Sequence, residues 1–296
     1  MRPPFNRFTL WFLLFFSQFS QAYELGAWYK RVPEIPRALN TRYEPSFLIL
    51  KTGIFSKSGN LKTVGEASQW KSLCDKDYRL IAWVTHRLGK KDSLSVTAAE
   101  LLGNDLNKAL TKSCFSAVEL DIEPLTGNEE WLVEFLTQLK STLSPKLKLR
   151  LAVPFIAENS QASSWKKAAA RKILSAIDGL DVMLYDSGSQ NSADYLKLLT
   201  ENIRLANQWA SEKPEKTIYL GIPAYHERTK LHLDNFENIA SFIQAGKSLL
   251  PNDVTKICTG NVALSFYAGW TLSPEDRKSI DELKKWLSET CPKGSP

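Results

Sequence analysis

Methionine, histidine and cysteine are scarce in this chain of 296 residues, which contains two, three and four of them. The cysteines form no Cys-x-x-Cys pair, and His86, His226 and His232 lack the spacing of metal ligands, so the sequence predicts no metal site. No Gly-rich phosphate turn follows an early strand, and we expect no nucleotide cofactor. Basic and aromatic residues do not cluster together, which argues against a nucleic-acid partner.

Long apolar runs are also absent, except near the N-terminus. Two arginines precede the run Leu10–Phe16, and small residues follow it within Ser20–Ala22. This pattern predicts a secretory signal peptide over residues 1–22, because the apolar run is too short to anchor a chain in a membrane. We expect residues 23–296 to form the mature protein, exported (periplasmic or secreted), not inserted in a membrane, and monomeric.

The four cysteines are consistent with two disulfides in an exported chain. Cys74 and Cys114 each precede a predicted strand, Cys258 precedes another, and Cys291 ends the last predicted helix. We therefore expect the pairs Cys74–Cys114 and Cys258–Cys291, which is one of the three connectivities that four cysteines allow.

Acidic and aliphatic residues alternate in the run Phe115–Pro124. On a β-strand Glu119, Asp121 and Glu123 would share one face, with aliphatic side chains on the other. Burying an unpaired charge is very costly, so three acids in line need solvent, partners or a function. An exposed acidic edge strand would give the same pattern, but the aliphatic residues and the flanking strands argue against it.

Strand and helix patterns alternate through the rest of the chain without a linker, a repeat or a low-complexity tract. The predicted strands are Leu25–Tyr29, Ser46–Ile54, Tyr78–Thr85, Ala117–Ile122, Lys148–Val153, Gly179–Tyr185, Thr217–Ile222 and Val262–Tyr267. Eight strands with helices between them predict an α/β fold, a single (β/α)8 TIM barrel. A doubly wound open sheet is the alternative.

Reactive residues of a parallel barrel gather where its strands end. Glu123 ends the fourth predicted strand, Tyr185 and Asp186 close the sixth, Tyr225 follows the seventh and Trp270 follows the eighth. Acids bind sugar hydroxyls and aromatic rings bind the apolar faces of sugars. These strand ends therefore indicate a carbohydrate cleft. The formal charge falls from +6 to +4 without Arg2 and Arg7, and this mild positive balance either favours an anionic surface such as a cell-wall polymer or only keeps the surface soluble.

The fourth-strand residues resemble a signature of the family 18 glycoside hydrolases, the chitinase-like barrels. That signature, Asp-x-x-Asp-x-Asp-x-Glu, is matched by Ser116, Glu119, Asp121 and Glu123. The first two positions depart from it. They mainly support the inner pair of acids, so the departures bear on efficiency more than on the type of reaction.

The later strands are similar to the same family in the expected order. Met183–Asp186 matches its sixth-strand Met-x-Tyr-Asp, Tyr219–Tyr225 looks like its seventh-strand segment, and Trp270 corresponds to its eighth-strand tryptophan. Only 36 residues separate Tyr225 from Val262, which leaves no room for the small α+β insertion of many members. The resemblance implies an open, shallow cleft.

The resemblance also implies how the site works. Glu123 would protonate the leaving glycosidic oxygen while the substrate's own 2-acetamido oxygen attacks the sugar. Asp121 would orient the acetamide, and Tyr185 would hold its oxygen from the other side. The further substrate-binding residues would be Glu119, Met183, Asp186, Tyr225 and Trp270, the last forming the floor under the reacting sugar. The expected partner is a glycan of N-acetylated amino sugars, chitin-like or peptidoglycan.

Three alternatives remain open in the sequence. Chitinase-like proteins that have lost catalysis survive as sugar-binding proteins, although Glu123, the residue usually lost, is present here. The segment Leu120–Pro124 also looks similar to the Asp-x-Glu strand of family 25 muramidases. Finally, Glu119 would be a structural acid if Arg150, on the next strand, points inward and neutralises it.

Overall fold

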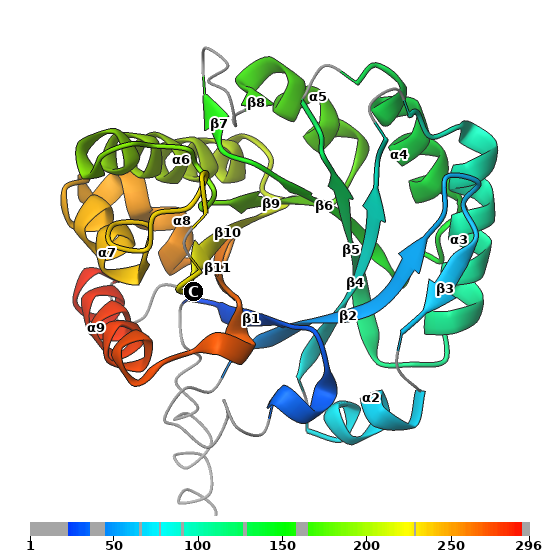
Figure 1. Cartoon of the computed structure of the whole chain (residues 1–296), viewed down its shortest axis with the longest axis horizontal. Helices are drawn as coiled ribbons and strands as arrows, with labels where there is room; N and C mark the ends of the chain where they lie inside the picture. Colours follow the sequence, from blue (N-terminus) through cyan, green and yellow to red (C-terminus); the bar gives the residue numbers. More distant parts are fainter. Residues whose placement is uncertain are drawn as a thin grey trace, which may run out of the picture.

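Pairing between the first and last strands closes a ring of parallel strands, as viewed end-on in Figure 1. The computed structural model describes residues 23–35, 45–64, 67–76, 78–89, 92–126, 129–157, 165–227 and 229–291. The ring strands are β1 (Leu25–Tyr29), β2 (Phe47–Phe55), β4 (Arg79–Arg87), β5 (Phe115–Glu123), β6 (Lys148–Val153), β9 (Gly179–Met183), β10 (Thr217–Pro223) and β11 (Val262–Tyr267). The chain is therefore a (β/α)8 barrel, as predicted. The predicted signal peptide, residues 1–22, lies outside the described residues.

Each ring strand lies where the sequence predicts one, with ends that differ by at most two residues. The strand β9 stops at Met183, two residues before the predicted end. The backbone then turns, and Asp186 adopts a left-handed conformation with φ of 53°. Tyr185 and Asp186 therefore lie in the turn above β9 and not in the strand itself.

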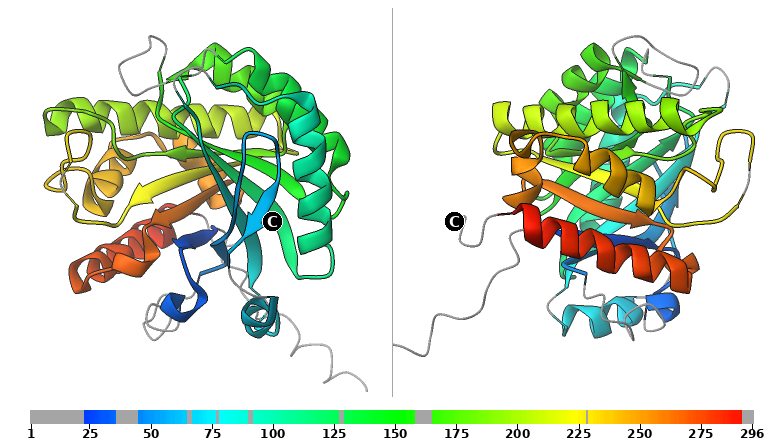
Figure 2. Two further views of the ribbon diagram at one scale, coloured as in Figure 1. Left: turned by 45° about the vertical axis from the view of Figure 1, so that its right-hand side comes forward. Right: turned by 90° about the vertical axis from the view of Figure 1, so that its left-hand side faces the viewer.

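Helices cover the outside of the ring (Figures 1 and 2). They are α2 (Ala67–Cys74), α3 (Val96–Leu110), α4 (Trp131–Thr142), α5 (Lys167–Ala176), α6 (Ser192–Glu212), α7 (Ile239–Lys247), α8 (Thr255–Cys258) and α9 (Pro274–Thr290). Short elements fill the connections: β3 (Leu61–Thr63), β7 (Ile156–Ala157), β8 (Trp165–Lys166), η1 (Val32–Glu34), η2 (Pro251–Val254) and η3 (Gly269–Thr271). No helix in the described part of the chain is both long and apolar enough to span a membrane.

Two apolar layers hold the barrel together. Outward-facing aliphatic residues of the strands, such as Val118, Leu120 and Ile122 of β5, are at most 1 % exposed against the helices. Inward-facing residues, such as Trp28 and Ile81, form a separate cluster inside the ring. The alternation in β5 therefore has its simplest explanation: the aliphatic side chains pack under the helices, and the acids point into the barrel.

Two disulfides connect the cysteines as predicted. Cys74 at the end of α2 bonds to Cys114, which lies one residue before β5, and Cys258 at the end of α8 bonds to Cys291 after α9. Between β10 and β11 the described residues contain helices and no strand, so the α+β insertion is absent there, as the sequence predicts.

Candidate active site

The acids of β5 form a graded series along the inner wall of the barrel. Glu119 is fully buried, Asp121 is partly buried, and Glu123 is exposed at the carboxyl end of the strand. Successive residues on one face of a strand lie about 6–7 Å apart. The barrel mouth therefore presents one carboxyl to solvent, with a second carboxyl directly below it.

A buried ion-pair network lies at the bottom of this series. Arg150 Nε is 2.6 Å from a Glu119 oxygen, and Arg150 Nη2 is 3.1 Å from Asp181. Ser265 Oγ donates to Asp181, and the guanidinium lies 3.2 Å from the centre of the Tyr219 ring. Burial raises the pKa of Asp181 to about 6, and Arg150 opposes that shift. Arg150 therefore points inward and pairs with Glu119, as the structural alternative for Glu119 required. The Glu119 side chain has no exposed surface, so it cannot contact a substrate as the resemblance implied.

Asp121 lies above this network. Trp83 Nε1 donates a hydrogen bond of 2.9 Å to its carboxylate. Burial, followed by the nearby charge of Glu123, raises the pKa of Asp121 to about 7, and the hydrogen bond from Trp83 and the charge of Lys51 oppose the shift. Asp121 can therefore hold a proton at a pH where an exposed aspartate is ionised.

Glu123 occupies the mouth of the barrel. Desolvation raises its pKa, the charge of Asp186 raises it further, and Arg87 on the neighbouring strand lowers it. Because the charge of Glu123 adds to burial in raising the pKa of Asp121, the pair retains a proton more readily than two separate carboxyls would. This arrangement can supply a proton to a bound group.

Tyr185 stands beside the acids from the turn above β9. It is 7 % exposed, and burial raises the pKa of its phenol, so the hydroxyl stays protonated and can donate. Its ring stacks on Tyr267, with centroids 4.8 Å apart and planes 11° apart. The centre of the Tyr267 ring also lies 6.4 Å from that of Trp83 and 5.6 Å from that of Trp270. The predicted floor residue, Trp270, thus lies in η3 next to Tyr267.

Sequence analysis missed Tyr267, although a signal for it was present. It is the last residue of β11, a strand whose bounds were predicted correctly, and it shares inward parity with Ser265. Tyr267 therefore occupies the strand-end position that the sequence argument associates with a site. The charges of Asp121 and Glu123, added to burial, raise the pKa of its phenol.

A hydrogen-bond clamp fixes the turn above β9. The Tyr225 hydroxyl donates to Asp186 Oδ1 at 2.7 Å, and the Tyr225 ring stacks on His232 at 4.1 Å. Buried Glu237 accepts hydrogen bonds from the Asp186 and Ser187 amides at 2.9 and 3.2 Å, and it lies 2.8 Å from His232 Nδ1. Sequence analysis missed His232 and Glu237, because both lie in a loop without periodic pattern and about 50 residues from the turn.

Three residues of this clamp could also hold a metal ion, and they are the group of that kind found among the described residues. One ligand atom from each of Asp186, His232 and Glu237 lies within 4.8 Å of the others. Both oxygens of Glu237 already accept backbone amides, and the Ser187 hydroxyl donates to the same carboxylate. These donors explain the buried carboxylate fully, so we interpret the group as a hydrogen-bond clamp.

Met183, His86 and His226 contact other parts of the protein. Met183, the last residue of β9, is half-buried and packs against the apolar cluster inside the ring. His86 stacks on Phe55 and lies 2.8 Å from its carbonyl oxygen. His226 lies 2.9 Å from Asp276. Both histidines therefore have local partners, as expected of histidines outside a catalytic pair.

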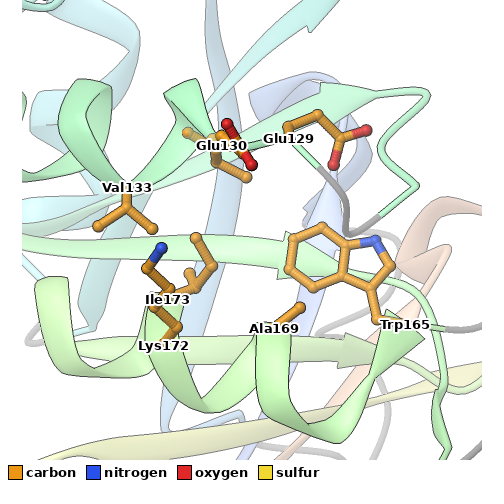
Figure 3. Close-up of a pocket in the computed structure, with 8 residues that line it drawn as sticks. Glu129, Glu130, Val133, Trp165, Ala169, Lys172 and Ile173 are labelled. Carbon is orange, nitrogen blue, oxygen red and sulfur yellow. The ribbon is translucent and has the colours of Figure 1, made fainter.

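A pocket on the outer surface is separate from this site. It lies between α4 and α5, where Trp165, Ile173 and Val133 form its wall and Glu130 and Lys172 its rim (Figure 3). None of the predicted site residues lines it. The acids and tyrosines at the barrel mouth therefore remain the candidate active site.

Comparison of the coordinates with solved structures finds similar folds among chitinases and spore cortex-lytic enzymes. The spore cortex-lytic enzyme SleL of Bacillus cereus matches with a TM-score of 0.61 and 13 % identity, over 93 % of this chain and 76 % of that one. The class V chitinase of Pseudomonas fluorescens matches with a TM-score of 0.61 and 12 % identity, over 88 % of this chain and 98 % of that one. The family 18 chitinase of Chromobacterium violaceum matches with a TM-score of 0.58 and 14 % identity, over 91 % of this chain and 83 % of that one.

The fold is like that of the family 18 glycoside hydrolases. No family model matches the sequence. No curated protein matches it either. The likeness is therefore one of fold, and the chemistry of this family 18-like barrel has to be argued from its own residues.

Proposed function

We propose that this protein is a glycoside hydrolase that cleaves polymers of N-acetylated amino sugars. The observation that carries the proposal is the stacked pair of carboxyls, Asp121 below Glu123, each with a raised pKa, at the open mouth of the barrel. The similar barrels of two chitinases and a spore cortex-lytic enzyme support it. The two disulfides support the proposal that residues 23–296 work outside the cytoplasm. We also propose that they do so as a monomer.

The acid at the strand end would start the reaction. Glu123 protonates the glycosidic oxygen that leaves, while the substrate's acetamide oxygen attacks the anomeric carbon from the opposite face. Asp121 accepts the acetamide N–H and stabilises the positive charge that develops on that group. The Tyr185 hydroxyl donates to the acetamide oxygen. Water then opens the cyclic intermediate, with Glu123 taking its proton, and the anomeric configuration is retained.

The aromatic residues would form the floor under the reacting sugar. Tyr267 lies between Tyr185 and Trp270 and borders the acids, so we place the reacting sugar on Tyr267 and the next sugar toward Trp270. Asp186 and Tyr225, hydrogen-bonded to each other, would contact sugar hydroxyls at the rim. Met183 would support the floor from below.

Replacing Glu123 by Gln tests the reaction. Gln cannot donate the proton, so release of reducing ends from chitin oligomers or wall glycan should fall by about 100-fold or more. The matched control is Glu282→Gln, on the exposed face of α9, which should keep full activity. Equal release by wild type and Glu123→Gln would contradict the proposal.

Two further outcomes separate this function from its alternatives. Binding of the oligomers without turnover by either form would identify a sugar-binding protein. Products that end in N-acetylmuramic acid, and not N-acetylglucosamine, would identify a muramidase. Sequencing the N-terminus of the exported protein tests whether cleavage follows Ala22.

A further inference from the structure

Arg87 lies directly beside the proposed proton donor in the sheet. It ends β4 as Glu123 ends β5, and the two parallel strands pair with Arg87 in register with Glu123. The Leu88 amide donates a hydrogen bond of 2.6 Å to the Glu123 carbonyl, which holds the two strand ends together. The proposed hydrolysis gives Glu123 a proton to transfer, but it assigns no role to Arg87.

The side chains of Arg87 and Glu123 leave their strands on the same face. Residues in register on neighbouring parallel strands point to one side of the sheet, and so do alternate residues along one strand. Trp83 has the same parity on β4 as Arg87, and it points into the barrel, because its Nε1 donates to Asp121. Arg87 therefore lies on the inner face at the mouth, where Arg87 and Glu123 are both exposed.

Glu123 stands between charges of opposite sign. In the ring, β5 has β4 with Arg87 on one side, and β6 followed by β9 with Asp186 on the other. Asp121 on the same strand and Tyr267 at the end of β11 also interact with the Glu123 charge. Among these groups of the described structure, Arg87 alone is a cation. Its charge attracts the Glu123 carboxylate toward β4, and the charge of Asp186 repels it from the β9 side.

The proposed reaction changes the charge of Glu123 twice. In the first step its proton passes to the glycosidic oxygen, the bond from that oxygen to the anomeric carbon breaks, and the acetamide oxygen bonds to that carbon. A carboxylate is left on Glu123. In the second step water attacks the anomeric carbon and gives its proton back to this carboxylate. A cation beside Glu123 stabilises the charged form, so it assists the first transfer and keeps the base ready for the second.

We propose that Arg87 is a positioning residue for the proton donor. Its guanidinium holds the Glu123 carboxyl on the β4 side of the mouth, away from Asp186, and stabilises the carboxylate that proton transfer leaves behind. No ion pair joins Arg87 to Glu123 in the described part of the chain, so the exposed carboxyl stays accessible to a substrate. This inference rests on the proposed function, because it concerns the acid of that reaction.

Titration of Glu123 in the free protein tests the electrostatic interaction without turnover. Carbon NMR of the full mature chain with labelled glutamate follows the carboxyl, and Glu123→Gln assigns its signal. The guanidinium lowers the pKa of Glu123, so its titration midpoint should move to higher pH in Arg87→Met. Arg87→Lys keeps the charge and should return the midpoint toward that of the wild type. Lys278→Met, on the exposed face of α9, should leave it unchanged.

The pH dependence of hydrolysis tests the effect on the reaction. The alkaline limb of kcat/KM for a chitin oligomer reports ionisation of the proton donor in the free enzyme, so this limb should move to higher pH in Arg87→Met. At a pH below the limb, kcat should fall by about threefold to tenfold while KM changes by less than about twofold, because the carboxyl gives up its proton less readily. Arg87→Lys should restore most of both quantities.

The outcomes separate this inference from the proposed function. An unmoved Glu123 midpoint in Arg87→Met overturns the inference, even if the wild type hydrolyses the oligomer. An unmoved alkaline limb in an active Arg87→Met enzyme also overturns it, and a raised KM would then show that Arg87 contacts the sugar itself. A moved midpoint in a protein that hydrolyses no glycan supports the interaction of Arg87 with Glu123 and defeats the proposed function.

Discussion

Residue by residue, β5 places three similar side chains in three different environments. Glu119 is neutralised by Arg150 in the barrel centre, Asp121 is bonded by Trp83, and Glu123 reaches the mouth. Depth in the barrel sets the cost of ionising each acid, and a partner offsets that cost only where one is within reach. At the middle acid, burial raises the pKa and the hydrogen bond from Trp83 opposes that shift, so the pKa of Asp121 is about 7.

The raised pKa of Asp121 makes stability depend on pH. Its pKa is about 7 in the folded protein and has an ordinary value of 3.8, so between these values the folded state holds a proton that the unfolded state releases. The contribution of Asp121 is present below pH 3.8 and is lost as the pH rises toward 7. Urea unfolding across this window should therefore show a falling free energy of unfolding, and Asp121→Asn should fall less steeply.

The control for this measurement is Asp281→Asn, an exposed residue of α9. It should leave the slope of stability against pH unchanged. Identical slopes for wild type and Asp121→Asn would show that Asp121 is ionised in the folded protein throughout the window.

Among the elements, the turn above β9 depends most on a distant loop. The turn displays Tyr185 and Asp186, and two of its backbone amides are bound by Glu237. His232 connects the same carboxylate to the ring of Tyr225. The loop after β10 thereby holds the turn after β9, and we predict that Glu237 positions this turn without contacting a substrate.

Replacing Glu237 by Gln should loosen this turn. One acceptor oxygen becomes an N–H donor that faces other donors, which costs about 1–3 kcal/mol of stability. We expect kcat to fall by about tenfold while KM changes by less than about twofold, because alignment is lost more than contact area. Steady-state kinetics on a chitin oligomer checks the split, and amide exchange at Ser187 should accelerate. A change confined to stability, with kcat retained, would limit Glu237 to a structural role.

At the scale of the whole molecule, the two disulfides cross-link helices on the outside of the barrel. The Cys258–Cys291 bond joins the end of α8 to the segment after α9, the last helix of the barrel. The bonded residues are 33 positions apart in the sequence, so the cross-link restricts a long loop of the unfolded chain.

Removing this cross-link should destabilise the barrel without changing its site. The double variant Cys258→Ser with Cys291→Ser should lose about 2–4 kcal/mol of unfolding free energy, measured in urea, and keep its binding of a chitin oligomer at low temperature. Removal of Cys74–Cys114 provides the matched comparison. An unchanged urea midpoint would show that the peripheral helices do not need the bond.

Local pattern was sufficient for the ring strands of this protein. Alternation along β5 and the apolar spacing of the helices are properties of neighbouring residues, and they predicted each ring strand, the barrel and the inward course of the acids. The disulfides and the Arg150–Glu119 pair followed as well, because each joins residues that adjacent elements bring to the same level. These features depend on backbone periodicity, which a sequence carries directly.

Contacts between residues far apart in the sequence were decided by the closure of the ring, because local periodicity carries no information about them. Tyr267 became the centre of the aromatic floor because β11 closes against β1, and Glu237 reached the turn above β9 through a loop without any repeating pattern. Such contacts join residues tens to hundreds of positions apart, and their geometry is fixed only when strand register and closure are known.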